Sequence, residues 1–172
     1  MITGARGCTI TKKNLKGLLS VTAGLLPALA ADILTKHFMW ETRDGTLIPG
    51  LLNHIRVQNT GMSFGLFSDG NLPLILISAA AILLIVLWLA RNETSRIQRV
   101  LSGILLGGAV GNLFDRVRFG FVRDFFQFDF FRSFPVFNLA DASIVVSAVL
   151  IVFFLIVPGR RSVKVDGNNP IE

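Results

Sequence analysis

The stretch LPLILISAAAILLIVLWLA, residues 72–90, decides the fold class, because it runs for 19 residues without a charged side chain. A helix of about 20 apolar residues is long enough to cross a hydrocarbon core about 30 Å thick. The stretch therefore predicts a transmembrane helix. The rest of the chain agrees with lipid as its solvent, since 52% of its 172 residues are hydrophobic, more than a soluble domain of this size can bury.

Three further apolar runs, at residues 18–34, 100–114 and 137–157, bring the expected number of spans to four. The chain is therefore predicted to be an all-α integral membrane protein with four transmembrane helices. We expect a single membrane domain over residues 16–158, with short tails at residues 1–15 and 159–172.

The basic residues predict the orientation. Of the 17 Lys and Arg residues, ten fall on the side of both tails and of the link between the second and third runs. Because cytoplasmic segments are enriched in Lys and Arg, both termini are expected in the cytoplasm. The net charge of +6 is spread over tails and loops, so membrane lipids rather than nucleic acid are the expected partner.

The first apolar run has a second interpretation, as a cleaved signal peptide. It follows a basic start and contains Ala28-Leu29-Ala30, a small-residue pattern typical of cleavage sites. Removing it leaves three spans in the same orientation, so topology does not separate the two interpretations.

Glycines recur at intervals of four in the third run, at Gly103, Gly107 and Gly111, with Gly108 beside them. Small residues at this spacing let helix backbones approach closely in lipid, where packing drives association. The pattern predicts a packing seam and indicates no chemistry by itself.

The two outer loops differ in character. Residues 53–58 alternate polar and apolar, which predicts a half-exposed strand with His54 as a solvated strand residue. The second loop, residues 119–134, is rich in Phe. These rings are expected at the lipid interface, the alternative being a strand edge that the membrane covers.

Polar residues, whose insertion into a membrane costs free energy, are predicted to lie at one depth near the outer ends of the spans. They are Asp32, Asn59, Asn112, Asp115, Arg116, Asp124, Asn138 and Asp141. Ionisable groups in or near a span usually serve a function. Each also has a structural interpretation: Asp32 can pair with Lys36 four residues on, and Asn138 can cap the last helix. These interpretations do not explain the shared depth.

A pair of carboxylates remains as the candidate catalytic group. His37 and His54 both fall in the first outer loop, Cys8 stands alone before the first run, and no metal-binding motif occurs. Two carboxylates held close together cannot both ionise readily, so one keeps a proton and the other is charged. Such a pair can hydrolyse a peptide bond without a cofactor or metal.

Four blocks of the chain together resemble the lipoprotein signal peptidase (signal peptidase II) family. The blocks are Asp32 with Lys36; NTG at 59–61 with Phe64 and Gly65; GGAVGNLFDR at 107–116 with Gly120, Val122, Asp124 and Phe125; and VFNLAD at 136–141 with Ile144. Their order and spacing match the family, which makes the combination far more specific than any one block. Met62 and Ser63 depart from it, where small residues are common.

The resemblance implies an aspartic endopeptidase of the bacterial inner membrane with its active site near the outer face. Its substrates would be diacylglyceryl-modified prolipoproteins, cut just before the lipidated cysteine. It implies Asp124 and Asp141 as the catalytic pair, and Asp32 and Lys36 as a structural pair. The residues that it implies as supporting or substrate-binding are Asn59, Gly61, Asn112, Asp115, Arg116, Asn138 and Ala140. It further implies four helices with a small extracytoplasmic sheet and a first helix that is retained. We expect a monomer.

Two other classes compete with this interpretation. A transporter or proton relay would place acids along the depth of the bilayer, whereas here they cluster on one side. A membrane scaffold would need only the glycine seam and would leave the acids without a purpose.

Overall fold

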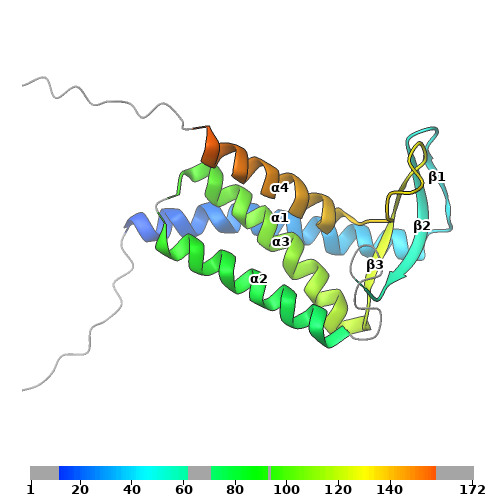
Figure 1. The fold of residues 1–172 in the computed structure, drawn as a ribbon, viewed down its shortest axis with the longest axis horizontal. Helices are drawn as coiled ribbons and strands as arrows, with labels where there is room; N and C mark the ends of the chain where they lie inside the picture. Colours follow the sequence, from blue (N-terminus) through cyan, green and yellow to red (C-terminus); the bar gives the residue numbers. More distant parts are fainter. Residues whose placement is uncertain (1–11, 62–70, 93, 158–172) are drawn as a thin grey trace, which may run out of the picture.

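The computed structural model describes residues 12–61, 71–92 and 94–157. In these ranges four helices are long and apolar enough to cross a membrane, as predicted. They are α1 (Lys12–Glu41), α2 (Asn71–Arg91), α3 (Arg96–Phe119) and α4 (Leu139–Ile156). The helices form one bundle, and the start of α1 and the end of α4 lie together at one end of it (Figure 1).

The helices extend beyond the apolar runs that predicted them. The helix α1 begins at Lys12, within the segment expected as a tail, and continues to Glu41. Asp32, expected at the outer end of this helix, therefore lies inside it. The helix α3 begins at the capping box of Ser95 and Gln98 and ends at Gly120, whose φ of 83° is left-handed. Polar caps rather than the limit of hydrophobicity set these ends.

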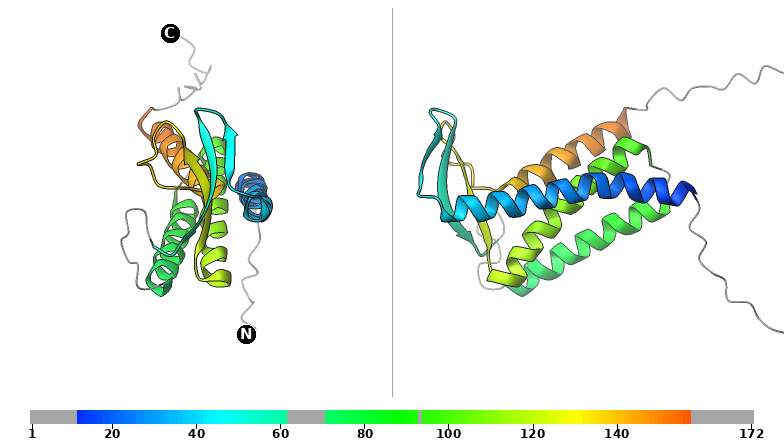
Figure 2. Two further views of the ribbon diagram at one scale, coloured as in Figure 1. Left: turned by 90° about the vertical axis from the view of Figure 1, so that its right-hand side faces the viewer. Right: turned by 180° about the vertical axis from the view of Figure 1, so that it is seen from behind.

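A small antiparallel sheet lies across the other end of the bundle (Figure 2). Its strands β1 (Gly45–Ile48), β2 (Leu52–Asn59) and β3 (Val122–Phe128) follow one another in that order. The sheet confirms the strand predicted from the alternation at residues 53–58. Asp124, expected in a loop, lies in β3, opposite Val57 of β2.

The prediction that His54 is solvated was wrong. Its exposed fraction is 1%, its ring packs 6.3 Å from that of Phe125, and Nδ1 lies 3.2 Å from the carbonyl oxygen of Arg43. The pairing of β2 with β3 shifts between His54 and Val57. Such a bulge changes which side of a strand is buried, and the sequence pattern does not reveal it.

The glycines of α3 form the predicted seam. A methyl group added to Gly103 would collide with the carbonyl oxygen of Val21 in α1, and one added to Gly107 would come 2.7 Å from that of Leu25. On another side of α3, a methyl group at Gly108 would come 2.7 Å from the carbonyl oxygen of Ala140. Glycine therefore lets α1 and the start of α4 lie directly against the backbone of α3.

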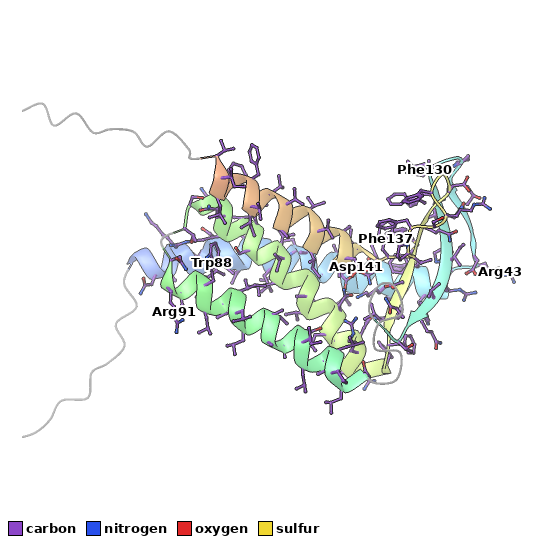
Figure 3. The ribbon with its side chains drawn as sticks, in the orientation of Figure 1. Arg43, Trp88, Arg91, Phe130, Phe137 and Asp141 are labelled. Atoms are coloured by element: carbon purple, nitrogen blue, oxygen red, sulfur yellow. The ribbon has the colours of Figure 1, made fainter. Side chains whose placement is uncertain are left out.

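The phenylalanines divide into two groups. Phe125 is fully buried, and Phe126 and Phe128 pack against Phe137 at ring distances of 5.8 and 5.1 Å. The rings of Phe119, Phe130, Phe131 and Phe134 are exposed, and Phe130 lies at the sheet end of the molecule (Figure 3). The expected contact with the lipid interface is therefore open to these exposed rings and not to the buried ones.

Candidate active site

Two backbone pairings bring the outer polar residues together around β3. On one edge, β2 pairs with β3 and carries Asn59 opposite Val122. On the other, the amides of Phe125 and Phe126 donate to the carbonyl oxygen of Phe137 at 3.1 and 2.8 Å, and Phe137 donates back to Phe126 at 2.9 Å. Asp124 in the middle of β3 thus lies between Asn59 and the residue that follows Phe137, Asn138.

Asp124 is held by two side-chain amides. Asn138 Nδ2 donates to Asp124 Oδ1 at 2.7 Å, and Asn59 Nδ2 donates to Oδ2 at 2.8 Å. The backbone amide of Gly61 donates to Asn59 Oδ1 at 3.1 Å, which orients the amide nitrogen Nδ2 of Asn59 toward Asp124. The exposed fraction of Asp124 is 1%. The carboxylate is thus buried, and both donors are neutral.

Asp141 is held in the same way at the start of α4, next to the sheet (Figure 3). Asn112 Nδ2 donates to Asp141 Oδ1 at 2.7 Å, and the backbone amide of Asn138 donates to Oδ2 at 3.2 Å. Asn138 Oδ1 in turn accepts from the Asp141 amide at 2.9 Å, which completes a capping box. The predicted cap role of Asn138 is confirmed, and the same side chain also binds Asp124.

Behind these acids lies a buried ionic layer centred on Lys36. Its Nζ lies 2.8 Å from Asp32 Oδ2 and 3.4 Å from Asp115 Oδ2, and it donates to Asn112 Oδ1 at 2.9 Å. Asp32 Oδ1 also accepts from the backbone amide of Ala140 at 3.0 Å. The predicted pairing of Asp32 with Lys36 is confirmed, and it reaches further than expected, tying α1 to α3 and α4.

Arg123 completes this ionic layer, and the sequence interpretation missed it. Its guanidinium donates to both oxygens of Asp115, at 2.7 and 3.2 Å, and its backbone amide donates to Oδ2 at 3.1 Å. It also lies 4.5 Å from the centre of the Phe119 ring. The one sequence signal for this contact was the alternation of side chains along a strand. Because neighbouring side chains point to opposite faces, Arg123 is turned toward the face of β3 opposite to that of Asp124.

Arg116 is near the acids but outside the network. Its charge acts on Asp141, Asp124 and Asp115, yet it forms no ion pair with an acid of the described ranges. Its Nε is buried without a hydrogen-bond partner there. Its carbonyl oxygen accepts from Asn71 Nδ2 at 2.7 Å, which joins α2 to α3.

Burial raises the pKa of Asp124 to about 7, with the nearby charge of Asp141 as the second cause. The hydrogen bonds from Asn59 and Asn138 oppose this shift without cancelling it. A carboxyl group with such a pKa keeps its proton in a large fraction of molecules at neutral pH. At neutral pH the site therefore offers a proton donor at Asp124 near a second carboxyl group, that of Asp141.

The structure thus connects nine residues of the predicted set by hydrogen bonds or ion pairs. They are Asp32, Lys36, Asn59, Gly61, Asn112, Asp115, Asp124, Asn138 and Asp141, with Ala140 joined through its backbone amide. Met62, Ser63, Phe64 and Gly65 lie outside the described residues. Within the described ranges, no three His, Cys, Asp or Glu side chains are grouped as ligands for a metal.

Comparison with solved structures agrees with this architecture. One bacterial membrane enzyme aligns over 91% of this chain and 94% of its own, with a TM-score of 0.71 and 24% identity. A second aligns over 83% of this chain and 94% of its own, with a TM-score of 0.71 and 26% identity. The first likeness supports the fold alone.

Sequence relatives identify the family. The lipoprotein signal peptidase of Thermosynechococcus vestitus is 39% identical over 76% of this chain and 86% of its own. That of Syntrophomonas wolfei is 38% identical over 76% and 85%, and that of Lactobacillus gasseri 33% identical over 84% and 96%. The family model described as signal peptidase (SPase) II matches residues 25–157, which include every residue of the network above. This chain belongs to the signal peptidase II family.

Proposed function

We propose that this protein is an aspartic endopeptidase that removes the signal peptide from diacylglyceryl-modified prolipoproteins, cutting just before the lipidated cysteine. The family and the names of the relatives support the substrate class. One observation supports the aspartic mechanism above all others. Asp124 and Asp141 lie at the same end of the bundle and share Asn138 as a donor, and all the donors to them among the described residues are neutral.

The two carboxyl groups divide the chemistry between them. The charged one takes a proton from water as the water oxygen attacks the scissile carbonyl carbon, and the protonated one donates to the carbonyl oxygen. When the tetrahedral intermediate collapses, the C–N bond breaks. The first acid then returns its proton to the leaving nitrogen of the cysteine, and the second recovers its own. The pair as a whole holds one proton before and after the reaction.

Neutral donors suit this cycle. An amide hydrogen bond orients a carboxyl group, whereas a neighbouring cation would also favour its charged form and remove the proton that the reaction needs. The reaction as proposed uses no metal and no cofactor. The protein would act as a monomer, in which the site is built entirely from one chain.

The orientation in the membrane follows from the basic residues. Lys16, Arg91, Arg96 and Arg99 lie at the end of the bundle away from the sheet. By the positive-inside rule that end faces the cytoplasm, so both termini would be cytoplasmic and the aspartates would lie near the outer face. A prolipoprotein would enter sideways from the outer leaflet, with its acyl chains remaining in lipid.

A mass-resolved cleavage assay tests the proposal. The purified protein is incubated in detergent with a diacylglyceryl-modified prolipoprotein, with and without EDTA, and the substrate mass is followed. We expect wild type to release the signal peptide whether or not EDTA is present, and Asp124→Asn and Asp141→Asn to release none. The matched control is Asp44→Asn, the same change at an exposed acid that pairs with Arg56, and it should cleave like wild type.

Each contrary result has a defined meaning. Cleavage that survives Asp124→Asn or Asp141→Asn would move the catalytic role to other residues. Inhibition by EDTA would replace the cofactor-free mechanism. Cleavage of the unmodified prolipoprotein at the same rate would remove the lipid requirement.

A further inference from the structure

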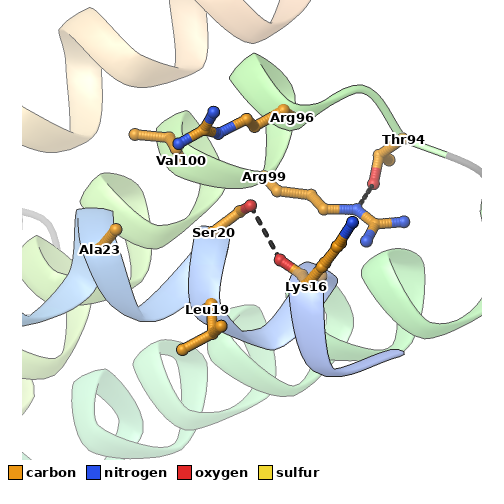
Figure 4. A pocket seen from close by; sticks show the side chains of 9 residues that line it. Lys16, Leu19, Ser20, Ala23, Thr94, Arg96, Arg99 and Val100 are labelled. Atoms are coloured by element: carbon orange, nitrogen blue, oxygen red, sulfur yellow. Dashed lines mark hydrogen bonds between the residues drawn. The ribbon is translucent and has the colours of Figure 1, made fainter. Parts of the chain in front are cut away.

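The end of the bundle opposite the aspartates contains a hollow of about 580 Å³ (Figure 4). It opens between the first turns of α1 and the start of α3. Three of its lining residues, Lys16, Arg96 and Arg99, carry positive charge, and none carries negative charge. The proposed chemistry uses nothing in this region, so the cluster needs its own explanation.

The cations of this hollow have no acidic partner in the part of the chain that the structure describes. Among the described residues, no acid forms an ion pair with Lys16, Arg96 or Arg99. Arg99 Nε donates to Thr94 Oγ1 at 2.9 Å, which fixes the guanidinium and leaves its two terminal nitrogens for another acceptor (Figure 4). The hollow also meets the N-terminus of α3, where the helix dipole favours an anion.

Gly17 makes room for this arrangement. A methyl group at Gly17 would collide with Arg99 Nη1. Glycine at this position therefore lets the guanidinium lie across α1 instead of extending into solvent. An arginine is thus held in place by Thr94 and Gly17, yet its charge has no partner in the described chain.

A second hollow, of about 650 Å³, adjoins the first and shares Gly17 and Arg99 with it. Its walls are mostly apolar and come from α1, α2 and α3. They include Leu18, Val21, Leu25, Val86, Leu89 and Leu106. Arg91 and Asn92, at the end of α2, also line it. A cationic pocket and an apolar groove therefore meet at one point.

We propose that this composite site binds one anionic phospholipid of the cytoplasmic leaflet. The phosphate contacts Lys16, Arg96 and Arg99, and one acyl chain lies in the groove between α1 and α2. Arginine forks suit phosphate oxygens, and basic pockets between helices on the cytoplasmic side are typical of acidic lipid sites. Because the lipid would contact three helices, it would stabilise the folded bundle without taking part in cleavage.

Native mass spectrometry and thermal unfolding test the proposal. Delipidated protein in neutral detergent is titrated with phosphatidylglycerol or with phosphatidylcholine of the same acyl chains. Wild type should bind one phosphatidylglycerol at least tenfold more tightly than phosphatidylcholine and show a higher Tm with it. Arg96→Gln/Arg99→Gln should lose this preference and this gain in Tm, while Arg96→Lys/Arg99→Lys should keep most of both.

The matched control is Arg43→Gln/Arg118→Gln, which removes the same charge from exposed positions at the sheet end of the chain. It should bind phosphatidylglycerol like wild type. Equal loss in the control would mean that net charge attracts the lipid, and would overturn the site. So would an undiminished preference in the Arg96→Gln/Arg99→Gln protein. Inorganic phosphate should not compete at tenfold excess, and full competition would overturn the role of the acyl groove.

Discussion

The sheet end of the bundle contains two pairs of acids, and their donors distinguish them. Asp32 and Asp115 are fully buried, and they lie against the cations Lys36 and Arg123. These ion pairs tie α1, α3 and β3 together. This first pair therefore belongs to the framework of the site.

The second pair is linked to the first through Asn112, yet no cation in the described ranges forms an ion pair with it. Asp124 and Asp141 accept from side-chain amides of Asn59, Asn138 and Asn112. Asn112 connects the two pairs, since its side-chain oxygen Oδ1 accepts from Lys36 while its amide nitrogen Nδ2 donates to Asp141. The charge of the groups that contact the acids, and not the depth of the acids, separates the two pairs.

Placing a cation beside Asp124 should make it resemble the framework acids. Asn59→Lys is expected to lower the pKa of Asp124, remove the shared proton and reduce initial cleavage rates by about 100-fold or more. The control Asn53→Lys makes the same change on the same strand, where Asn53 donates to Asp129. Rates that fall equally in the two variants would show that strand charge, and not the dyad, is responsible.

Removing the central cation of the framework should cost stability. Lys36→Met leaves Asp32 and Asp115 buried without that partner, which is expected to cost about 3–5 kcal/mol. Chemical unfolding in lipid-free detergent measures the loss, with the exposed Lys16→Met as the control on the same helix. A Lys36→Met protein as stable as wild type would remove the distinction between the pairs.

The stability of the protein should also depend on pH through Asp124. The pKa of Asp124 is about 7 when folded, against an ordinary value of 3.8. The folded state therefore binds the proton more tightly, so its contribution to stability is full below pH 3.8 and is lost as the pH rises to about 7. The unfolding free energy of wild type should fall across this window more steeply than that of Asp124→Asn.

The same shift predicts the alkaline side of the pH–rate profile. Cleavage should decline above about pH 7 as Asp124 loses its proton. The hydrogen bond from Asn59 lowers this pKa, so Asn59→Ala should move the decline to higher pH. An unchanged or lower midpoint in Asn59→Ala would contradict the assignment of that limb to Asp124.

The smallest expected effect concerns Arg123, the second cation that contacts the framework acids. Arg123→Lys keeps the charge beside Asp115 but loses the forked contact, which should cost about 1 kcal/mol of stability and leave the cleavage rate nearly unchanged. Unfolding and initial rates measured on the same preparation test this split. A fall in rate of tenfold or more would move Arg123 from the framework into the catalytic layer.

Much of this architecture could be predicted from the sequence because the signals are local. Residues 72–90 predict a span from composition alone, Gly103 and Gly107 predict a seam from their spacing, and Asn138 predicts a cap from its position. Helix ends were less predictable. The helix α1 continues past Asp32 to Glu41, although the apolar run that predicted it ends at Leu34.

The remaining errors come from contacts between distant segments. Nothing near Arg123 in the sequence indicates that its guanidinium meets Asp115 of α3. The bulge that buries His54 depends on the register with β3, and the division of the phenylalanines depends on which rings meet Phe137. Spacing paired Asp32 with Lys36, but only the family resemblance separated Asp124 and Asp141 from Asp115, because most of the donors to these three acids come from other elements.

A parallel comparison of four Asp→Asn variants tests the central distinction most directly. Tm and cleavage of the diacylglyceryl-modified prolipoprotein are measured for changes at Asp32, Asp115, Asp124 and Asp141. We predict that the Asp124 and Asp141 variants keep or raise the wild-type Tm and lose cleavage, while the Asp32 and Asp115 variants lose Tm, and lose cleavage only as far as they unfold. Cleavage by a folded Asp124→Asn or Asp141→Asn protein, or a normal Tm in the Asp32 and Asp115 variants, would contradict it.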